Sequence, residues 1–140
     1  MERRYFLKSV AAAGLTGTLI TSCTPPEEES TTSNAIASGT ILHSVHFWLK
    51  EDISDDEEKD FLNFFEELRK VPKVQTLQYG KPAPTNPRPV VDNSFQYNLL
   101  VTFRNMEDIN TYETHPTHIA AAEQYNKYWV KVEVRDTIIS

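Results

Sequence analysis

The feature that most restricts how this chain can fold is a run of alternating residues at 95–103. Every second side chain in this run is aromatic or branched and apolar: Phe95, Tyr97, Leu99, Val101 and Phe103. Gln96, Asn98 and Thr102 lie between them. Successive side chains of a β-strand point to opposite faces of the sheet, so a period of two predicts a strand with one buried face.

Three other segments have strand character: residues 41–50, residues 74–79 and the stretch that begins at Tyr128. The first is rich in aromatic and β-branched residues and presents two faces. One face carries His43, Val45, Phe47 and Leu49, and the other carries Ser44, His46, Trp48 and Lys50. In the last strand the apolar positions are Tyr128, Val130, Val132 and Val134.

Two helical regions separate these strands. Ser54 and Glu57 have the spacing of a capping box and predict a helix that ends before Pro72. Its core-facing stripe consists of Phe61, Phe64, Phe65 and Leu68. Asn105 caps the second region, in which His115-Pro116 predicts a break before a further helical piece at about 117–126.

The resulting order is β-α-β-β-α-β, an α+β class with the ferredoxin-like split βαβ arrangement. The two central strands are joined by a long loop that starts at Gly80 and runs to about Asn93. Four prolines restrict this loop, which favours a rigid rim over a mobile flap: Pro82, Pro84, Pro87 and Pro89.

The first 23 residues have the pattern of an export signal. Arg3-Arg4 precede a weakly apolar stretch that is too short to span a bilayer. This start resembles a twin-arginine signal. Glu2 departs from that pattern, in which Ser or Thr is usual, so export by the Sec route stays open. Residues 20–23 resemble a lipobox, with Cys23 as the residue to be acylated. The interpretation is therefore a signal at 1–23, a disordered linker at 24–40 and one domain at 41–140 of a bacterial envelope lipoprotein, anchored on the periplasmic or outer side.

Composition excludes several function classes. Cys23 is the only cysteine, which rules out an intramolecular disulfide framework and a cysteine-based zinc site. The formal net charge is −6, and removal of residues 1–23 makes it more negative. A chain this acidic and without a basic patch is a poor nucleic-acid partner. We expect no cofactor and no metal site; for His46 a polar position on the other sheet face is favoured over metal binding.

The stretch from Tyr112 to His118 has the strongest chemical character in the sequence. The phenol of Tyr112 and the imidazoles of His115 and His118 lie within seven residues, at the helix break. Imidazole titrates near physiological pH and a phenol can donate a proton, so the group suits acid–base chemistry. Residue types alone favour the alternative, in which these histidines are helix caps and satisfied core groups.

This chain resembles the stress-responsive dimeric α/β-barrel proteins, often called Dabb domains, over about residues 41–137. The matching features are His43 and Phe47 in the first strand, Gly80, Phe103, Tyr112 followed by His-Pro-x-His, and Asp136. The resemblance implies a ferredoxin-like monomer that forms a homodimer, with two sheets closing a barrel. The alternating strands agree, since they have more apolar surface than two helices on one side would need. Val132→Asp should split the dimer if the face that carries Val132 is the buried one.

The resemblance also implies a site. Family members with polyketide-cyclase chemistry use residues that correspond to Tyr112, His118 and His43. These residues lie beside an apolar pocket, and the resemblance implies that Leu62, Phe65 and Leu99 line it here. His118 would then act as a base next to a carbonyl, with Tyr112 on the developing oxyanion and His43 assisting. His115 is interpreted as structural.

Two functional hypotheses follow. The favoured one is a binding domain for a small apolar ligand, with a stress-related role in the envelope. The alternative is an envelope enzyme of the proton-transfer type, similar to a cyclase or isomerase, that uses Tyr112, His118 and His43.

Overall fold

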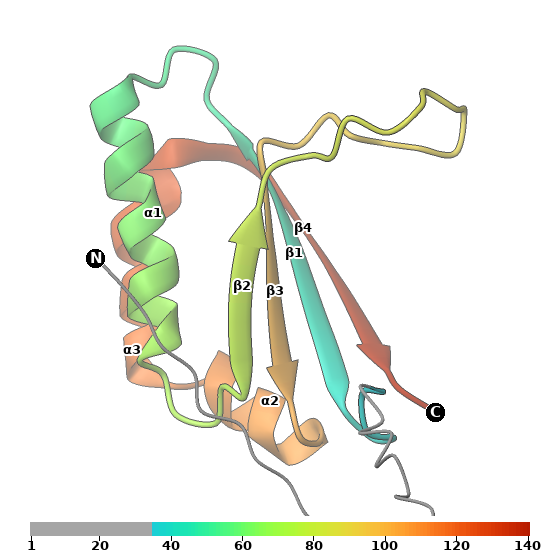
Figure 1. The fold of residues 1–140 in the computed structure, drawn as a ribbon. Coiled ribbons are helices and arrows are strands. Elements are labelled where there is room, and N and C mark those ends of the chain that lie inside the picture. The colour runs from blue at the N-terminus through green and yellow to red at the C-terminus, as the bar shows by residue number, and fades with distance from the viewer. Residues whose placement is uncertain (1–34) are drawn as a thin grey trace, which may run out of the picture. The chain divides into compact units, whose positions relative to one another are not determined.

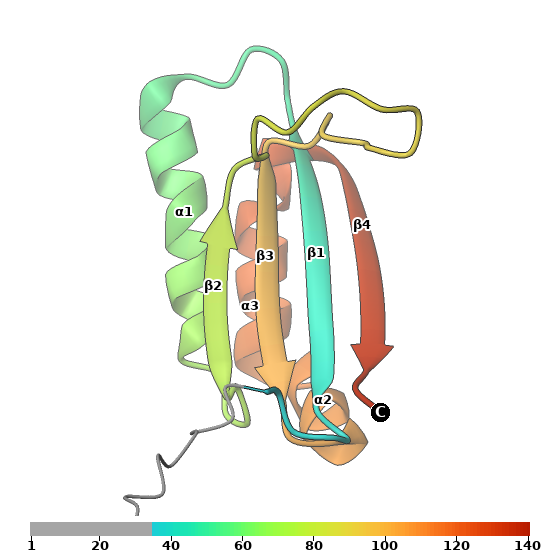
Figure 2. The same ribbon diagram turned by 45° about the vertical axis from the view of Figure 1, so that its right-hand side comes forward.

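The computed structural model describes residues 35–140, which form one sheet covered by helices on one face (Figure 1). Cys23 and the signal segment lie outside the described residues. The elements are β1 (Ile41–Leu49), α1 (Asp55–Arg69), β2 (Thr76–Gly80), β3 (Tyr97–Phe103), α2 (Met106–Glu113), α3 (Pro116–Tyr125), a 3-10 turn η1 (Asn126–Tyr128) and β4 (Trp129–Ile138). The strand order is β2-β3-β1-β4 and all pairs are antiparallel, as Figure 2 shows. This confirms the predicted α+β, ferredoxin-like class.

The helix ends follow the signals in the sequence. Ser54 accepts a hydrogen bond from the Glu57 backbone while the Glu57 carboxylate accepts from the Ser54 backbone, so the predicted capping box is present. Asn105 caps α2 by accepting from the backbone N–H of Asp108 at 2.9 Å. His115 caps α3 through its Nδ1, which accepts from the Thr117 backbone at 3.1 Å. This bond agrees with the structural role predicted for His115.

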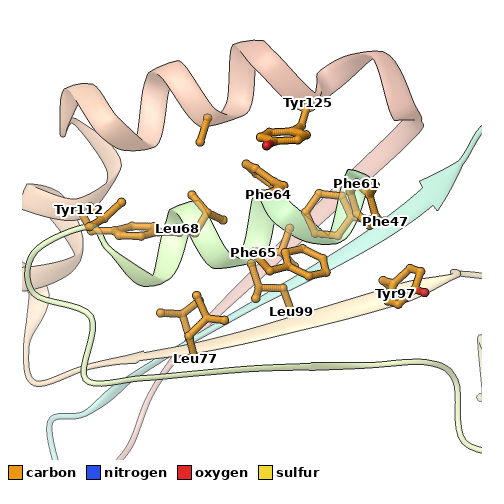
Figure 3. Packing of buried hydrophobic residues seen from close by; sticks show 14 of the residues in the cluster. Phe47, Phe61, Phe64, Phe65, Leu68, Leu77, Tyr97, Leu99, Tyr112 and Tyr125 are labelled. Carbon is orange, nitrogen blue, oxygen red and sulfur yellow. The ribbon is translucent and has the colours of Figure 1, made fainter. Parts of the chain in front are cut away.

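The core lies between the sheet and the helical layer formed by α1 and α3. Alternate residues of β1 and β3 point into it, together with the predicted stripe of α1. Phe47 lies beside the rings of Phe61, Phe64 and Phe65, at centroid distances of 5.5 to 6.0 Å. Figure 3 shows Tyr112 at one end of this cluster and Tyr97 at the other. Close packing of these aromatic rings makes the interface between the sheet and the helices rigid.

The opposite face of the sheet has no helix over it among residues 35–140 (Figures 1 and 2). Leu42, Ser44, His46 and Trp48 lie on this open face and are half-buried. The proline-rich loop projects beyond the strands, and the Trp48 indole donates to Ser94 Oγ of that loop at 2.9 Å. None of the helices in the described part of the chain is long and apolar enough to cross a membrane.

The last strand departs from the predicted pattern in two ways. The β1–β4 register shifts between Trp48 and Leu49, so Val130 lies in a bulge and is 71% exposed. Val132 pairs with Phe47, whose side chain is in the core, and it therefore lies on the helical side of the sheet. Val132→Asp is therefore no test of a dimer that closes through the open face, because its condition, that the face carrying Val132 is the buried one, is not met.

Candidate functional site

A cavity of about 500 Å³ lies between the sheet and the helices. Apolar side chains from β1, α1, β3, α3 and β4 form most of its wall: Val45, Phe47, Phe64, Leu68, Leu99, Ala122, Trp129, Val132 and Val134. His43, Tyr112, Glu113 and His118 complete the wall. An apolar chamber with a few converging polar groups is the usual form of a small-molecule site.

His43 is fixed in this wall by a carboxylate. It lies at a buried position of β1, and its Nδ1 is 2.6 Å from Oδ1 of Asp136 on β4. The His43 side chain is 8% exposed, whereas that of Asp136 is 47% exposed. A carboxylate on one ring nitrogen orients the imidazole and leaves the second nitrogen for another partner.

Tyr112 is held by ring packing alone. Its side chain is almost completely buried, with centroids 4.9 Å from Phe103 and 4.6 Å from His118. The hydroxyl makes no hydrogen bond to any residue of the described segment. Burial raises the pKa of Tyr112, and the Glu113 carboxylate acts in the same direction. The phenol therefore stays protonated at physiological pH and can donate a hydrogen bond.

His118 differs from the other two because one of its ring nitrogens is unsatisfied. Nδ1 is buried and has no hydrogen-bond partner among residues 35–140. Burial lowers the pKa of His118, nearby His43 adds to this effect, and the backbone of Glu113 opposes it. The imidazole is thus neutral at physiological pH, the form in which histidine can accept a proton.

The structure brings Tyr112, His118 and His43 together, as the resemblance implied. Their rings form a chain in which Tyr112 is central, 6.1 Å from His43 and 4.6 Å from His118. One phenol that donates, one neutral imidazole and one imidazole oriented by a carboxylate form a set suited to proton transfer or to binding a ligand oxygen.

The three apolar residues expected beside the site have different positions. Leu99 lines the cavity. Phe65 is fully buried in the core, where its nearest ring is Tyr79 at 4.7 Å. Leu62 lies on the other side of α1, in a shallow surface hollow with Glu58 and Tyr97. The cavity side of α1 is instead formed by Phe64 and Leu68.

Several residues of this site cannot be recognised from the sequence pattern. Asp136 is one of the features that match the family, but the resemblance gives it no functional role, and the sequence gives no role to Glu113. Val132 and Val134 line the open side of the cavity and are 45% and 47% exposed. His43 and Asp136 are cross-strand partners, so their contact depends on the β1–β4 register, which one strand's pattern does not specify.

His46 lies outside this site, on the open face of the sheet. Its ring packs against Phe95 with centroids 4.8 Å apart, in a hollow that also contains Glu133 and Arg135. The predicted position on the other sheet face is confirmed.

The profile of the stress-responsive A/B barrel domain matches residues 41–139, which is nearly all of the described chain. The chain belongs to this family. The chain is also similar to the olivetolic acid cyclase of Cannabis sativa, to which it is 22% identical over 97 residues, 69% of this chain and 93% of the cyclase.

Solved structures give the same fold for this A/B barrel domain. A dimeric, ferredoxin-like protein of unknown function from Bacteroides fragilis is 24% identical and superimposes with a TM-score of 0.56, covering 74% of this chain and 100% of that one. Hydroxynitrile lyase from Passiflora edulis is 18% identical with a TM-score of 0.59, covering 74% and 96%.

Proposed function

We propose that this A/B barrel domain binds a small, largely apolar molecule that carries a carbonyl or hydroxyl oxygen. The observation that carries the proposal is His118, which lines the cavity and whose buried Nδ1 has no hydrogen-bond partner among residues 35–140. An unsatisfied buried polar group costs about 1–3 kcal/mol, and a ligand oxygen at this nitrogen would recover that cost. The apolar walls would take the rest of the molecule.

A second function, proton transfer next to a carbonyl, is supported by the polar set around His118. Neutral His118 would accept the proton, and the Tyr112 hydroxyl would donate to the oxygen on which negative charge develops. His43, oriented by Asp136, would assist. Relatives named as a cyclase and a lyase support the view that this fold accommodates catalysis.

Acetophenone and ethylbenzene provide a matched pair of probes for the binding proposal. Both contain an apolar ring, but only acetophenone has an oxygen. We expect titration followed by NMR to show tighter binding of acetophenone, with its shifts centred on Tyr112 and His118. Ala122→Phe would fill the cavity and remove binding, whereas Ala120→Phe, at an exposed position of the same helix, would retain it. Equal binding by both variants would refute this location.

The same probe separates binding from catalysis. Proton transfer would exchange the methyl hydrogens of acetophenone for deuterium in D₂O, because the proton removed by His118 is replaced from solvent. Exchange that is lost in His118→Asn, while binding persists, supports the enzyme. Binding to the wild-type protein without exchange above that in buffer supports the binding domain.

We also infer that the domain forms a homodimer and works at a membrane. The open sheet face and a relative described as dimeric support the first inference. The lipobox-like residues 20–23 support lipid anchoring through Cys23 in the bacterial envelope. Cys23→Ala should release the protein from the membrane fraction, and retention of this variant would contradict the anchor. Normal processing after Arg3→Lys with Arg4→Lys would assign export to Sec.

A further inference from the structure

Three potential metal ligands meet at one end of the cavity. His43 comes from β1, Glu113 is the last residue of α2, and Asp136 comes from β4. Each offers one ligand atom, and all three atoms lie within 4.8 Å of one another. His43 is buried, while both carboxylates are accessible from solvent. The cluster therefore combines a fixed imidazole with two carboxylates that an ion can reach.

No lysine or arginine of the described part of the chain forms an ion pair with the carboxylates of this cluster. Asp136 bonds only to His43, and the Glu113 side chain has no ion pair or hydrogen bond within residues 35–140. Several other acidic groups of the domain are paired with lysine or arginine, for example Asp108 with Arg104 and Lys73. Two carboxylates so close together repel each other, and a bound cation would remove that repulsion.

We propose that His43, Glu113 and Asp136 bind a divalent transition-metal ion of the Zn²⁺ type, which would replace the hydrogen bond between His43 Nδ1 and Asp136 and release its proton to solvent. One imidazole nitrogen with two carboxylate oxygens suits Zn²⁺, Co²⁺ or Mn²⁺ better than Mg²⁺ or Ca²⁺, which prefer oxygen alone. Metal–ligand bonds of about 2.0–2.2 Å require ligand atoms that are slightly closer than 4.8 Å. The exposed Glu113 side chain can make that adjustment without a change in the backbone.

Three protein ligands leave a coordination position open, which is the arrangement of zinc sites that bind a further molecule. His43 and Glu113 both line the cavity, so the open position would be accessible to an oxygen of a molecule bound there. The site would thus hold a small oxygen ligand, such as a carboxylate, a carbonyl or water. This inference is independent of the ligand-binding proposal, since metal binding needs none of the apolar wall.

Calorimetric titration of the full chain with ZnCl₂ tests the site directly. All samples carry Cys23→Ser, so that the thiol does not bind the metal. We expect the parent to bind one Zn²⁺ per chain. Loss of a residue that only supports a metal ligand weakens metal affinity by roughly 10–100-fold, so Glu113→Gln, which removes a ligand, should weaken it by at least that much. Glu123→Gln removes an exposed carboxylate of α3 that forms no ion pair with the described residues; it serves as the matched control and should bind as the parent does.

Two further measurements keep the outcome decisive. Co²⁺ should give a visible absorption spectrum of a coordinated site in the parent but not in Glu113→Gln, and Zn²⁺ should raise the melting temperature of the parent only. Acetophenone binding in the presence of EDTA shows separately whether the cavity is functional. Absence of stoichiometric Zn²⁺ binding, or equal affinity in Glu113→Gln and the parent, would overturn the proposal.

Discussion

The three polar side chains of the cavity are held in place by different means, and this determines what each can do. Asp136 fixes His43, while ring packing fixes Tyr112. His118 has a lowered pKa and a buried nitrogen without a partner among residues 35–140, so it is well placed to respond to a ligand. Substitutions at Tyr112 and His118 should therefore have distinct signatures.

Tyr112→Phe should reduce ligand binding without reducing stability. The hydroxyl has no hydrogen-bond partner within residues 35–140, so its removal should change the free energy of unfolding by less than about 1 kcal/mol. Tyr112→Ala removes the packed ring and should cost about 3–5 kcal/mol. Urea unfolding measures both values, and acetophenone affinity should fall about five- to tenfold in Tyr112→Phe. A loss of more than about 2 kcal/mol in Tyr112→Phe would show that the hydroxyl is structural.

His118→Asn should change how stability depends on pH. Because the folded pKa of His118 is below its unfolded value, the unfolded chain binds the proton first as the solution is acidified. Stability contributed by the neutral ring is complete above about pH 6.5 and is lost as the pH falls towards the folded pKa. His118→Asn has no imidazole at this position, so it does not lose this part of its stability as the pH falls. Unfolding measured from pH 7.5 to 5 should show a shallower decline in His118→Asn, and parallel curves would refute the argument.

Part of the site is visible in the sequence because it is local. Tyr112, His115 and His118 lie within seven residues around a proline, so their proximity needs no knowledge of the tertiary fold. Asp136 and Glu113 are different, because they reach His43 only through strand register and through the end of α2. No spacing motif connects the three, and the sequence therefore predicted no metal site.

At the scale of elements, local chemistry predicts where helices begin better than it predicts which side chain points where. The apolar stripe of α1 was correct, yet Phe64 and Leu68 line the cavity while Phe65 packs into the core. The difference depends on how the helix is rotated over the sheet, which a helical period alone does not determine. The bulge near Val130 is likewise a property of the strand pair and not of one strand.

The capping box of α1 should contribute measurably to stability. Ser54→Ala removes an acceptor for the helix N-terminus and should lower the free energy of unfolding by about 1 kcal/mol. Ser54→Asn keeps a side-chain acceptor and should remain close to the parent. Chemical denaturation with both variants checks the effect. An equal loss in the two variants would mean that another contact of Ser54 is responsible.

At the scale of the whole molecule, the two faces of the sheet differ. Helices cover one face, and no element among residues 35–140 covers the other. The helical face is filled by the aromatic core and the cavity. The open face carries half-buried residues of both central strands, including Trp48 and Leu100. The alternation of the central strands allowed this two-faced sheet to be predicted, but their sequence does not specify what covers the second face.

Leu100→Glu should separate a homodimer formed through the open face. Leu100 pairs with Ser44 and Gln78, which places its side chain on that face at the centre of the sheet. Burying an unpaired carboxylate there should weaken association by about 100-fold or more, equivalent to about 3 kcal/mol. Ile119→Glu is the control, because Ile119 is 46% exposed on α3, in the helical layer. Sedimentation velocity at micromolar concentration should show dimers for the parent and Ile119→Glu and monomers for Leu100→Glu. A monomeric parent would refute the dimer, and a dimeric Leu100→Glu would mean that association uses another surface.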